Sequence, residues 1–254
     1  MVGKDLIMAT LFGGGSGGGW PEAPDDGKTR LYIHLAEGRT SPMLGVGVNG
    51  TVTVDWGDGT EPDVLTGTKT SSAVWTPTHN YSAPGHYVIT FSLDGEMALH
   101  GTMSANLGSY CLRYTASQDV RNYTYNNAIE KVDIGANTST YGNYTFYSCA
   151  GLFEANLSNY QYNEIVGSMF YRCNRLARIK IPSNVTTISS SAFYQCYGVT
   201  TYDFTDHTAV PTLSNTNAFG GIPADCEIRV PTALYDEWIA ATNWSTYADY
   251  IKAY

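Results

Sequence analysis

The sequence predicts a mainly β protein in which a small β-sandwich is followed by a short solenoid of repeats and a C-terminal helical cap. Short segments of alternating apolar and polar residues, bounded by turn residues, follow one another from Arg30 to about residue 105. A seven-residue block beginning at Phe146 then recurs 24 and then 23 residues further on. Residues 233–242 finally carry a helical pattern.

Residues 1–27 are predicted to precede the folded core as an apolar peptide and a glycine-rich linker. The run Leu6–Phe12 is similar to the apolar part of a signal peptide, but Asp5 adjoins it and the tract Gly13–Gly19 replaces a small-residue cleavage site. We therefore interpret this segment as a sticky peptide on a flexible tether and not as a secretion signal.

Residues 28–105 are predicted to form the sandwich. Alternation predicts strands at 31–35, 52–56 and 87–91, and a further strand at 97–100 after an Asp94-Gly95 hairpin signal. The segments Val54–Thr60 and His79–Tyr87 resemble, in order and spacing, the polycystic-kidney-disease (PKD) type of immunoglobulin-like domain. This resemblance implies an immunoglobulin-like β-sandwich.

The acidic residues of the first segment allow two interpretations. Asp55, Asp58 and Asp63 supply the carboxylate oxygens that calcium prefers, but a full set of six or more oxygen ligands is not evident. We expect Asp55 and Asp58 to shape the turn through side-chain to backbone hydrogen bonds instead. His79 and His86 are expected to be turn and strand residues.

Residues 128–232 are predicted to stack as five rungs of a solenoid, because one short repeat cannot bury its apolar face alone. The short strands are expected at residues 129–134, 152–157, 176–181, 199–204 and 228–231. Phe146, Phe170 and Phe193 should form one interior column. The cysteines of the same blocks should form a second column of inert core thiols, since no Cys-x-x-Cys pair occurs among the five cysteines.

The repeats resemble the leucine-rich repeats of BspA-like bacterial surface proteins. The pattern is clearest from Phe170 to Ser191, with an almost unbroken Ile-Pro-Ser-Asn-Val-Thr-Thr-Ile segment at 181–188. It dissolves in residues 106–127, which are either a linker or a degenerate first repeat. Residues 233–254 are expected to cap the open end of the stack.

Two kinds of residue are candidates for ligand binding. Seventeen of the twenty tyrosines follow residue 105, many beside Asn, Ser or Gly, which is the residue vocabulary of antibody paratopes. These tyrosines either bind a ligand or cover a small core. Outward positions of the short strands, including Lys131, Asp133 and Glu154, form a strip of alternating charge that either pairs internally or recognises a ligand. The candidate ligand-binding residues are Tyr123, Tyr125, Tyr141, Tyr144, Tyr160, Tyr162, Arg178 and Lys180.

Composition excludes several functions. A net charge of −9 argues against nucleic acid as a partner, and the longest apolar runs are too short to span a membrane. Neither a nucleophile–base motif nor a metal-ligand motif occurs, so we expect no enzymatic activity, no cofactor and no metal.

The expected function is non-enzymatic binding or adhesion. Both resemblances imply modules that decorate bacterial surfaces and phage particles. We expect a phage virion or tail-associated protein that recognises a cell-surface glycan or protein receptor and contacts other virion subunits. A bacterial cell-surface adhesin and a purely structural virion decoration protein are the alternatives, so the expected location is the virion or the cell surface.

Overall fold

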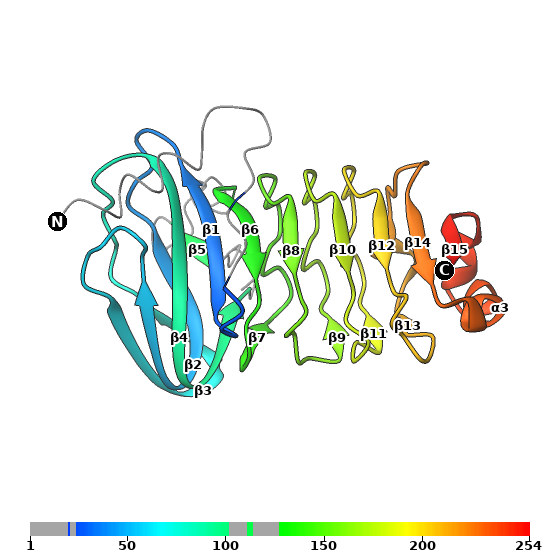
Figure 1. The fold of residues 1–254 in the computed structure, drawn as a ribbon, viewed down its shortest axis with the longest axis horizontal. Coiled ribbons are helices and arrows are strands. Elements are labelled where there is room, and N and C mark those ends of the chain that lie inside the picture. Colours follow the sequence, from blue (N-terminus) through cyan, green and yellow to red (C-terminus); the bar gives the residue numbers. More distant parts are fainter. Residues whose placement is uncertain (1–19, 21–23, 102–110, 114–126) are drawn as a thin grey trace.

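The computed structural model describes residue 20 and residues 24–101, 111–113 and 127–254, and this part of the chain is mainly β. Long strands lie at one end, a row of short strands follows, and the helix α3 lies at the other end (Figure 1). Among the described residues, no helix is long and apolar enough to cross a membrane.

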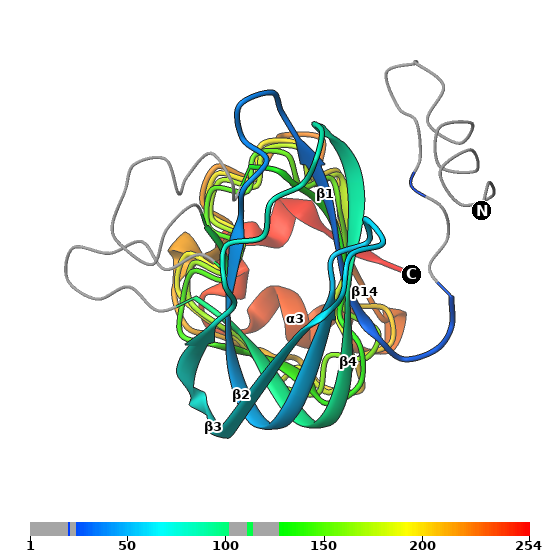
Figure 2. The same ribbon diagram turned by 90° about the vertical axis from the view of Figure 1, so that its left-hand side faces the viewer.

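The N-terminal strands are long and antiparallel. They are β1 (Thr29–Leu35), β2 (Met43–Asp55), β3 (Asp63–Trp75) and β4 (Gly85–His100), which pair in the order β1-β4-β2-β3, while β5 (Leu112–Arg113) pairs with β2. Figure 2 shows β2, β3 and β4 crossing the end of the stack of short strands. Strand β3 was not predicted because it is a polar edge strand, with Leu65 buried but Val64 exposed.

The predicted hairpin at Asp94-Gly95 is wrong, because β4 runs through both residues as one strand. Gly95 lies opposite Gly50 of β2, and Gly50 lies opposite Gly67 of β3, so three glycines form a row across the sheet. Gly50 and Gly95 have φ of 112° and 119°. A Cβ on Gly50 would lie 2.2 Å from the Asp94 carbonyl oxygen. Glycine therefore marks a point here where the backbones approach too closely for side chains, not a turn.

The short strands of the repeats pair in parallel. One sheet contains β6 (Ile129–Asp133), β8 (Glu154–Asn156), β10 (Arg178–Lys180), β12 (Thr201–Asp203) and β14 (Glu227–Val230), in this order. A second sheet contains β9 (Glu164–Ile165), β11 (Thr187–Ile188) and β13 (Thr212–Leu213). Successive strands thus come from successive repeats and lie side by side (Figure 1).

The interior columns are confirmed. The rings of Phe146 and Phe170 lie 5.5 Å apart, those of Phe170 and Phe193 lie 5.4 Å apart, and Phe219 adds a fourth ring 5.4 Å beyond Phe193. The sequence did not identify Phe219 because two glycines and an isoleucine follow it in place of Tyr-x-Cys. All four rings are buried.

The cysteine column lies beside the phenylalanines. Cys149, Cys173 and Cys196 are buried, and the Cys173 and Cys196 thiols donate to the carbonyls of Phe146 and Phe170 at 3.1 and 2.9 Å. Burial raises the pKa of all three thiols, that of Cys196 to about 12. These cysteines are therefore protonated core side chains.

The two regions share one sheet and one core. Strand β1 pairs antiparallel with β6, and β7 (Thr138–Tyr141) pairs in parallel with β4. The buried apolar residues of the long strands and of the repeats form one continuous cluster. The long strands therefore cover the first repeat directly.

The C-terminal segment covers the last repeat. It contains η2 (Thr232–Leu234), α3 (Tyr235–Ala240), η3 (Trp244–Tyr250) and β15 (Ile251–Ala253), and β15 extends the parallel sheet beside β14. The short helix η1 (Thr216–Phe219) lies before β14 and carries the fourth ring of the phenylalanine column. Trp238 and Trp244 are buried against Phe204, with ring centroids 5.4 and 5.5 Å from its ring.

Candidate ligand-binding surface

A column of stacked tyrosines runs along the turns of the repeats. Tyr147, Tyr171 and Tyr194 each follow a column phenylalanine, and their ring centroids lie 4.7 and 5.1 Å apart. The column ends at Gly220, where a Cβ would lie 2.6 Å from the Tyr194 ring. The three rings are half-buried. Mutual stacking covers their faces, so this column serves packing more than contact with a flat ligand.

Left-handed backbone explains why these turns look alike. Ser148, Arg172 and Gln195 have φ of 56°, 59° and 59°, and the glycine at the next equivalent position, Gly221, has φ of 83°. The amide of each of the three donates to a carbonyl of the following repeat, as from Arg172 to Tyr194 at 2.9 Å. The same conformation therefore recurs in each turn because the next rung stabilises it.

Only part of the predicted tyrosine set lies on the described surface. Tyr123 and Tyr125 fall outside the described residues. Tyr141 is exposed and lies against His100, with ring centroids 4.9 Å apart. Tyr144 is half-buried and packs edge-on against Tyr147. Tyr141 thus lies at the junction of the repeats with β4, where β7 pairs with that strand.

Tyr160 is buried and Tyr162 is exposed, although only one residue separates them in the chain. Tyr160 is 2% exposed, and its hydroxyl lies 3.1 Å from that of Thr140 and donates to the Glu164 carbonyl. Burial raises its pKa to about 12, so its ring is a core contact and cannot meet a ligand. Tyr162 is 43% exposed and, with Asn137 and Gln161, lines a small pocket of about 100 Å³.

One of the two predicted charged residues of β10, Lys180, lies beside a larger pocket. Lys180 forms an ion pair with Asp206 at 2.6 Å, and both side chains are exposed. These two side chains, with Asn156, Ser158 and Asn184, line a pocket of about 360 Å³ at the carboxyl ends of β8 and β10. Arg178 is exposed at the other end of β10, opposite Glu154. The structure therefore separates Arg178 from the pocket that Lys180 lines.

A second pocket continues the first along the stack. It has a volume of about 290 Å³ and shares Asn156 and Ser158 with the first pocket. Together the two are lined by four basic and four acidic side chains: Lys28, Arg30, Lys131, Lys180, Asp25, Asp133, Glu154 and Asp206. We call this pair of pockets the polar groove. Its charges balance although the whole chain carries a net charge of −9.

The prediction that Lys131 and Asp133 occupy outward positions on the surface is wrong. They are 6% and 5% exposed because β1 and the segment before it lie alongside β6. Lys131 instead binds Glu154 of the next rung at 2.8 Å and lies over the Tyr32 ring. Internal pairing therefore holds at this end of the strip, and further along the strip Lys180 binds Asp206.

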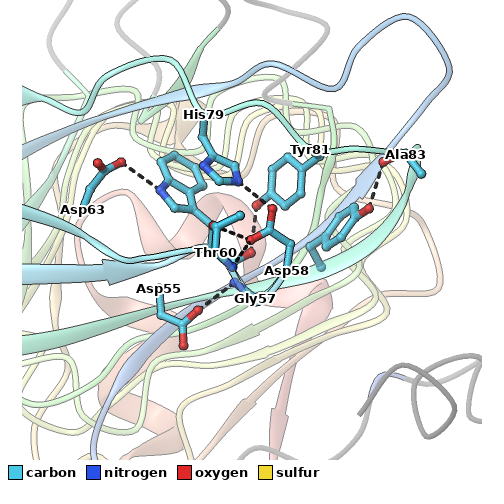
Figure 3. A network of polar contacts seen from close by, with 10 residues as sticks. Asp55, Gly57, Asp58, Thr60, Asp63, His79, Tyr81 and Ala83 are labelled. Carbon is cyan, nitrogen blue, oxygen red and sulfur yellow. Dashed lines mark hydrogen bonds and ion pairs between the residues drawn. The ribbon is translucent and has the colours of Figure 1, made fainter. Parts of the chain in front are cut away.

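The acidic residues near Trp56 are engaged in turn contacts. Asp55 accepts from the Gly57 amide at 2.9 Å, and Asp58 accepts from the Thr60 amide and hydroxyl and lies 2.8 Å from His79. Asp63 accepts from the indole nitrogen of Trp56 at 2.9 Å. Figure 3 shows the three carboxylates pointing to different partners. This arrangement shapes the loop and does not gather ligands around one point.

The comparisons with known proteins bear on the second half of the chain. Residues 106–221 match the BspA type leucine rich repeat region, in six copies. These are BspA-type leucine-rich repeats. No curated protein matches the chain, and no solved structure does.

The match differs from the predicted boundaries at both ends. It begins at residue 106 and so includes 106–127, where the sequence pattern alone is too weak to decide between a linker and a repeat. It ends at residue 221, before β14, although β14 continues the parallel sheet of the BspA-type repeats. Sheet pairing thus extends beyond the recognisable sequence repeat.

Sequence reasoning identified four of the eight charged residues of the polar groove. Lys131, Asp133, Glu154 and Lys180 were among the predicted outward or candidate residues, but Asp25, Lys28, Arg30 and Asp206 were not. Asp206 lies in the turn after β12, and a single polar turn residue carries no signal. What identifies it is the stacking of the BspA-type repeats, which places the turn after each strand beside the turn after its neighbour.

Proposed function

We propose that this protein is a non-enzymatic binding protein that contacts a cell-surface glycan through the polar groove of its repeats. The repeats act as a solenoid that displays the groove, and the long strands act as a PKD-type immunoglobulin-like sandwich that covers its first rung. The Asp58–His79 contact supports the second assignment, since it joins the two segments that carry the resemblance.

The observation that carries the proposal is the balanced charge of the polar groove. A polyanion would require an excess of Lys and Arg, which the four acidic side chains here cancel. Amide, hydroxyl and carboxylate groups are the hydrogen-bonding partners of a neutral polyhydroxyl ligand. Tyr141 and Tyr162 lie exposed on the same repeats and add aromatic surface for such a ligand.

We further propose that the protein acts on the outside of a phage particle, as a virion or tail-associated host-recognition component. Residues 1–27 would tether it to other virion subunits. A protein receptor and a bacterial adhesin role are consistent with the same groove.

The test is binding of the purified full chain to a glycan array and to whole bacterial cells. Lys180→Ala removes a groove cation, and Lys69→Ala removes an exposed cation of β3 outside the groove. We expect Lys180→Ala to weaken binding at least tenfold and Lys69→Ala to leave it unchanged. Equal binding by both variants would show that the ligand binds at another surface of the protein.

A purely structural role is the second candidate, because β3 and β15 are the two edge strands of the long sheet. An edge strand presents unpaired backbone groups to a neighbouring chain. Association with purified virions in the absence of any glycan or cell binding would favour this candidate.

A further inference from the structure

A second group of polar side chains lies where β1, β4 and β6 meet, away from the polar groove. His34 of β1 lies directly opposite His86 of β4, and their rings are parallel with centroids 4.2 Å apart. Glu130 of β6 completes the group. No sequence motif indicates this group, because its three residues belong to strands that are far apart along the chain.

A β-bulge in β6 turns the side chain of Glu130 toward the two histidines. Tyr32 pairs with Lys131, but Ile33 pairs with Ile129, so Glu130 is an extra residue in the β1–β6 ladder. An extra residue in a strand redirects its own side chain, which is one use that proteins make of bulges. Glu130 thereby reaches the face of the sheet that carries His34 and His86.

The distances in this group are too long for hydrogen bonds. Glu130 Oε1 lies 3.6 Å from His34 Nδ1, and Glu130 Oε2 lies 3.7 Å from His86 Nε2. One ligand atom from each of the three residues lies within 4.8 Å of the other two. Two ligands of a tetrahedral zinc ion are about 3.3 Å apart when each metal–ligand bond is about 2.0 Å. The two imidazole rings are stacked, so they must turn out of the stack before their in-plane nitrogen lone pairs and the carboxylate can bind one ion.

The surroundings orient the group. The Trp20 indole nitrogen donates to Glu130 Oε2 at 3.1 Å, and the Trp20 ring packs edge-on against His86. Metal sites commonly contain a hydrogen-bond donor that is not itself a ligand and that holds a ligating carboxylate in place. Burial and the neighbouring His34 lower the pKa of His86.

We propose that His34, His86 and Glu130 form a binding site for a divalent transition-metal ion, with zinc as the first choice. Two imidazoles and one carboxylate suit zinc and leave its fourth position for water or for a group from a partner. The His34 side chain is 50% exposed, so that position opens to solvent. The ion would join β1, β4 and β6, and hence the long strands to the repeats.

The test is zinc binding by the untagged full chain after treatment with a chelator. Isothermal titration with zinc chloride gives the affinity, and elemental analysis after gel filtration gives the stoichiometry. We expect one zinc ion per chain and a higher melting temperature with zinc than without it. Glu130→Gln, which keeps the shape of the side chain, should weaken zinc binding at least tenfold.

The matched control is Glu237→Gln, which removes an exposed carboxylate of α3 at the other end of the molecule and should bind zinc as the native chain does. His34→Ala provides a second test at an exposed position if Glu130→Gln disturbs folding. Zinc binding that is unchanged in both Glu130→Gln and His34→Ala would place the ion elsewhere, for example on the thiols. That result, or the lack of saturable binding by the native chain, would overturn the proposal.

Discussion

The repeats and the long N-terminal strands reach the same continuous core by different means. In the repeats, strands of two to five residues pair in parallel and equivalent side chains stack, as in the phenylalanine column with its spacing of 5.4–5.5 Å. In the N-terminal region, strands of up to 16 residues pair antiparallel and depend on features that occur once. The row of Gly50, Gly67 and Gly95 is one such feature, and the contacts around Trp56 are another.

This difference predicts which substitutions should destabilise each region most. A repeated stack distributes its stability over equivalent positions, and neighbouring rungs support one another. A bent antiparallel sheet places strict demands on a few backbone positions. The following substitutions test this contrast.

The largest expected effect is on the column of phenylalanines. Phe170→Ala should lower the free energy of unfolding by about 3–5 kcal/mol, because it leaves a cavity between the rings of Phe146 and Phe193. Urea denaturation of the native chain and the variant measures this change in the free energy of unfolding. Phe153→Ala, at a half-buried position outside the column, should cost about 1 kcal/mol. Similar losses in the two variants would contradict the stacked core.

The glycine row should be almost as sensitive. Gly50→Ala should cost about 2–4 kcal/mol, because its Cβ would lie 2.2 Å from the Asp94 carbonyl oxygen and its φ of 112° is unfavourable for alanine. Gly59→Ala is the control, since φ is also positive there but no atom lies within 4 Å of the added Cβ. It should cost about 1 kcal/mol. Equal melting temperatures for the two variants would show that the close approach is not required.

Acid should weaken the N-terminal region through Asp58. Burial raises the pKa of this carboxyl, but hydrogen bonds from Thr60 and His79 outweigh it and leave the pKa below its ordinary value. A lowered folded-state pKa means that the carboxylate stabilises the protein above the unfolded-state pKa, and that this stability is lost as the pH falls through the folded-state value.

Asp58→Asn should therefore cost about 1–2 kcal/mol at pH 7 and much less at pH 2–3. Melting curves of both proteins across this pH range measure the difference. A constant difference between them at every pH would show that the charge of Asp58 plays no part.

The smallest effect is expected at the surface of the repeats. Lys180→Ala breaks an exposed ion pair with Asp206 and should change the free energy of unfolding by less than about 1 kcal/mol. The same variant should lose ligand binding. A large loss of stability would instead assign Lys180 a structural role and would weaken the proposed function.

The sequence predicted the repeats better than the long strands. Phenylalanine and cysteine recur at 23–24-residue spacing, and a recurring side chain can only stack on its equivalents, so its burial follows from the sequence. Strand β3 shows little apolar alternation because it lies at the edge of the sheet, and it was missed. Asp94-Gly95 has the composition of a turn, but its glycine is required by the close approach of strand β2, which the local sequence does not show.

The candidate sites depend still more on long-range pairing. Tyr160 and Tyr162 look alike in the sequence, yet packing against Thr140 buries the first and leaves the second exposed. Lys131 was predicted on the surface because nothing near it in the chain shows that β1 would cover it.

The sequence by itself determined the mainly β character, the repeat period and the identity of the stacked interior side chains. These features follow from periodicity, which is a local property of the chain. Only the tertiary structure decided that the long strands and the repeats share one sheet, that two pockets join into the polar groove, and that His34, His86 and Glu130 meet. Each of these depends on which strands become neighbours and in what register, and no short segment of the chain contains that information.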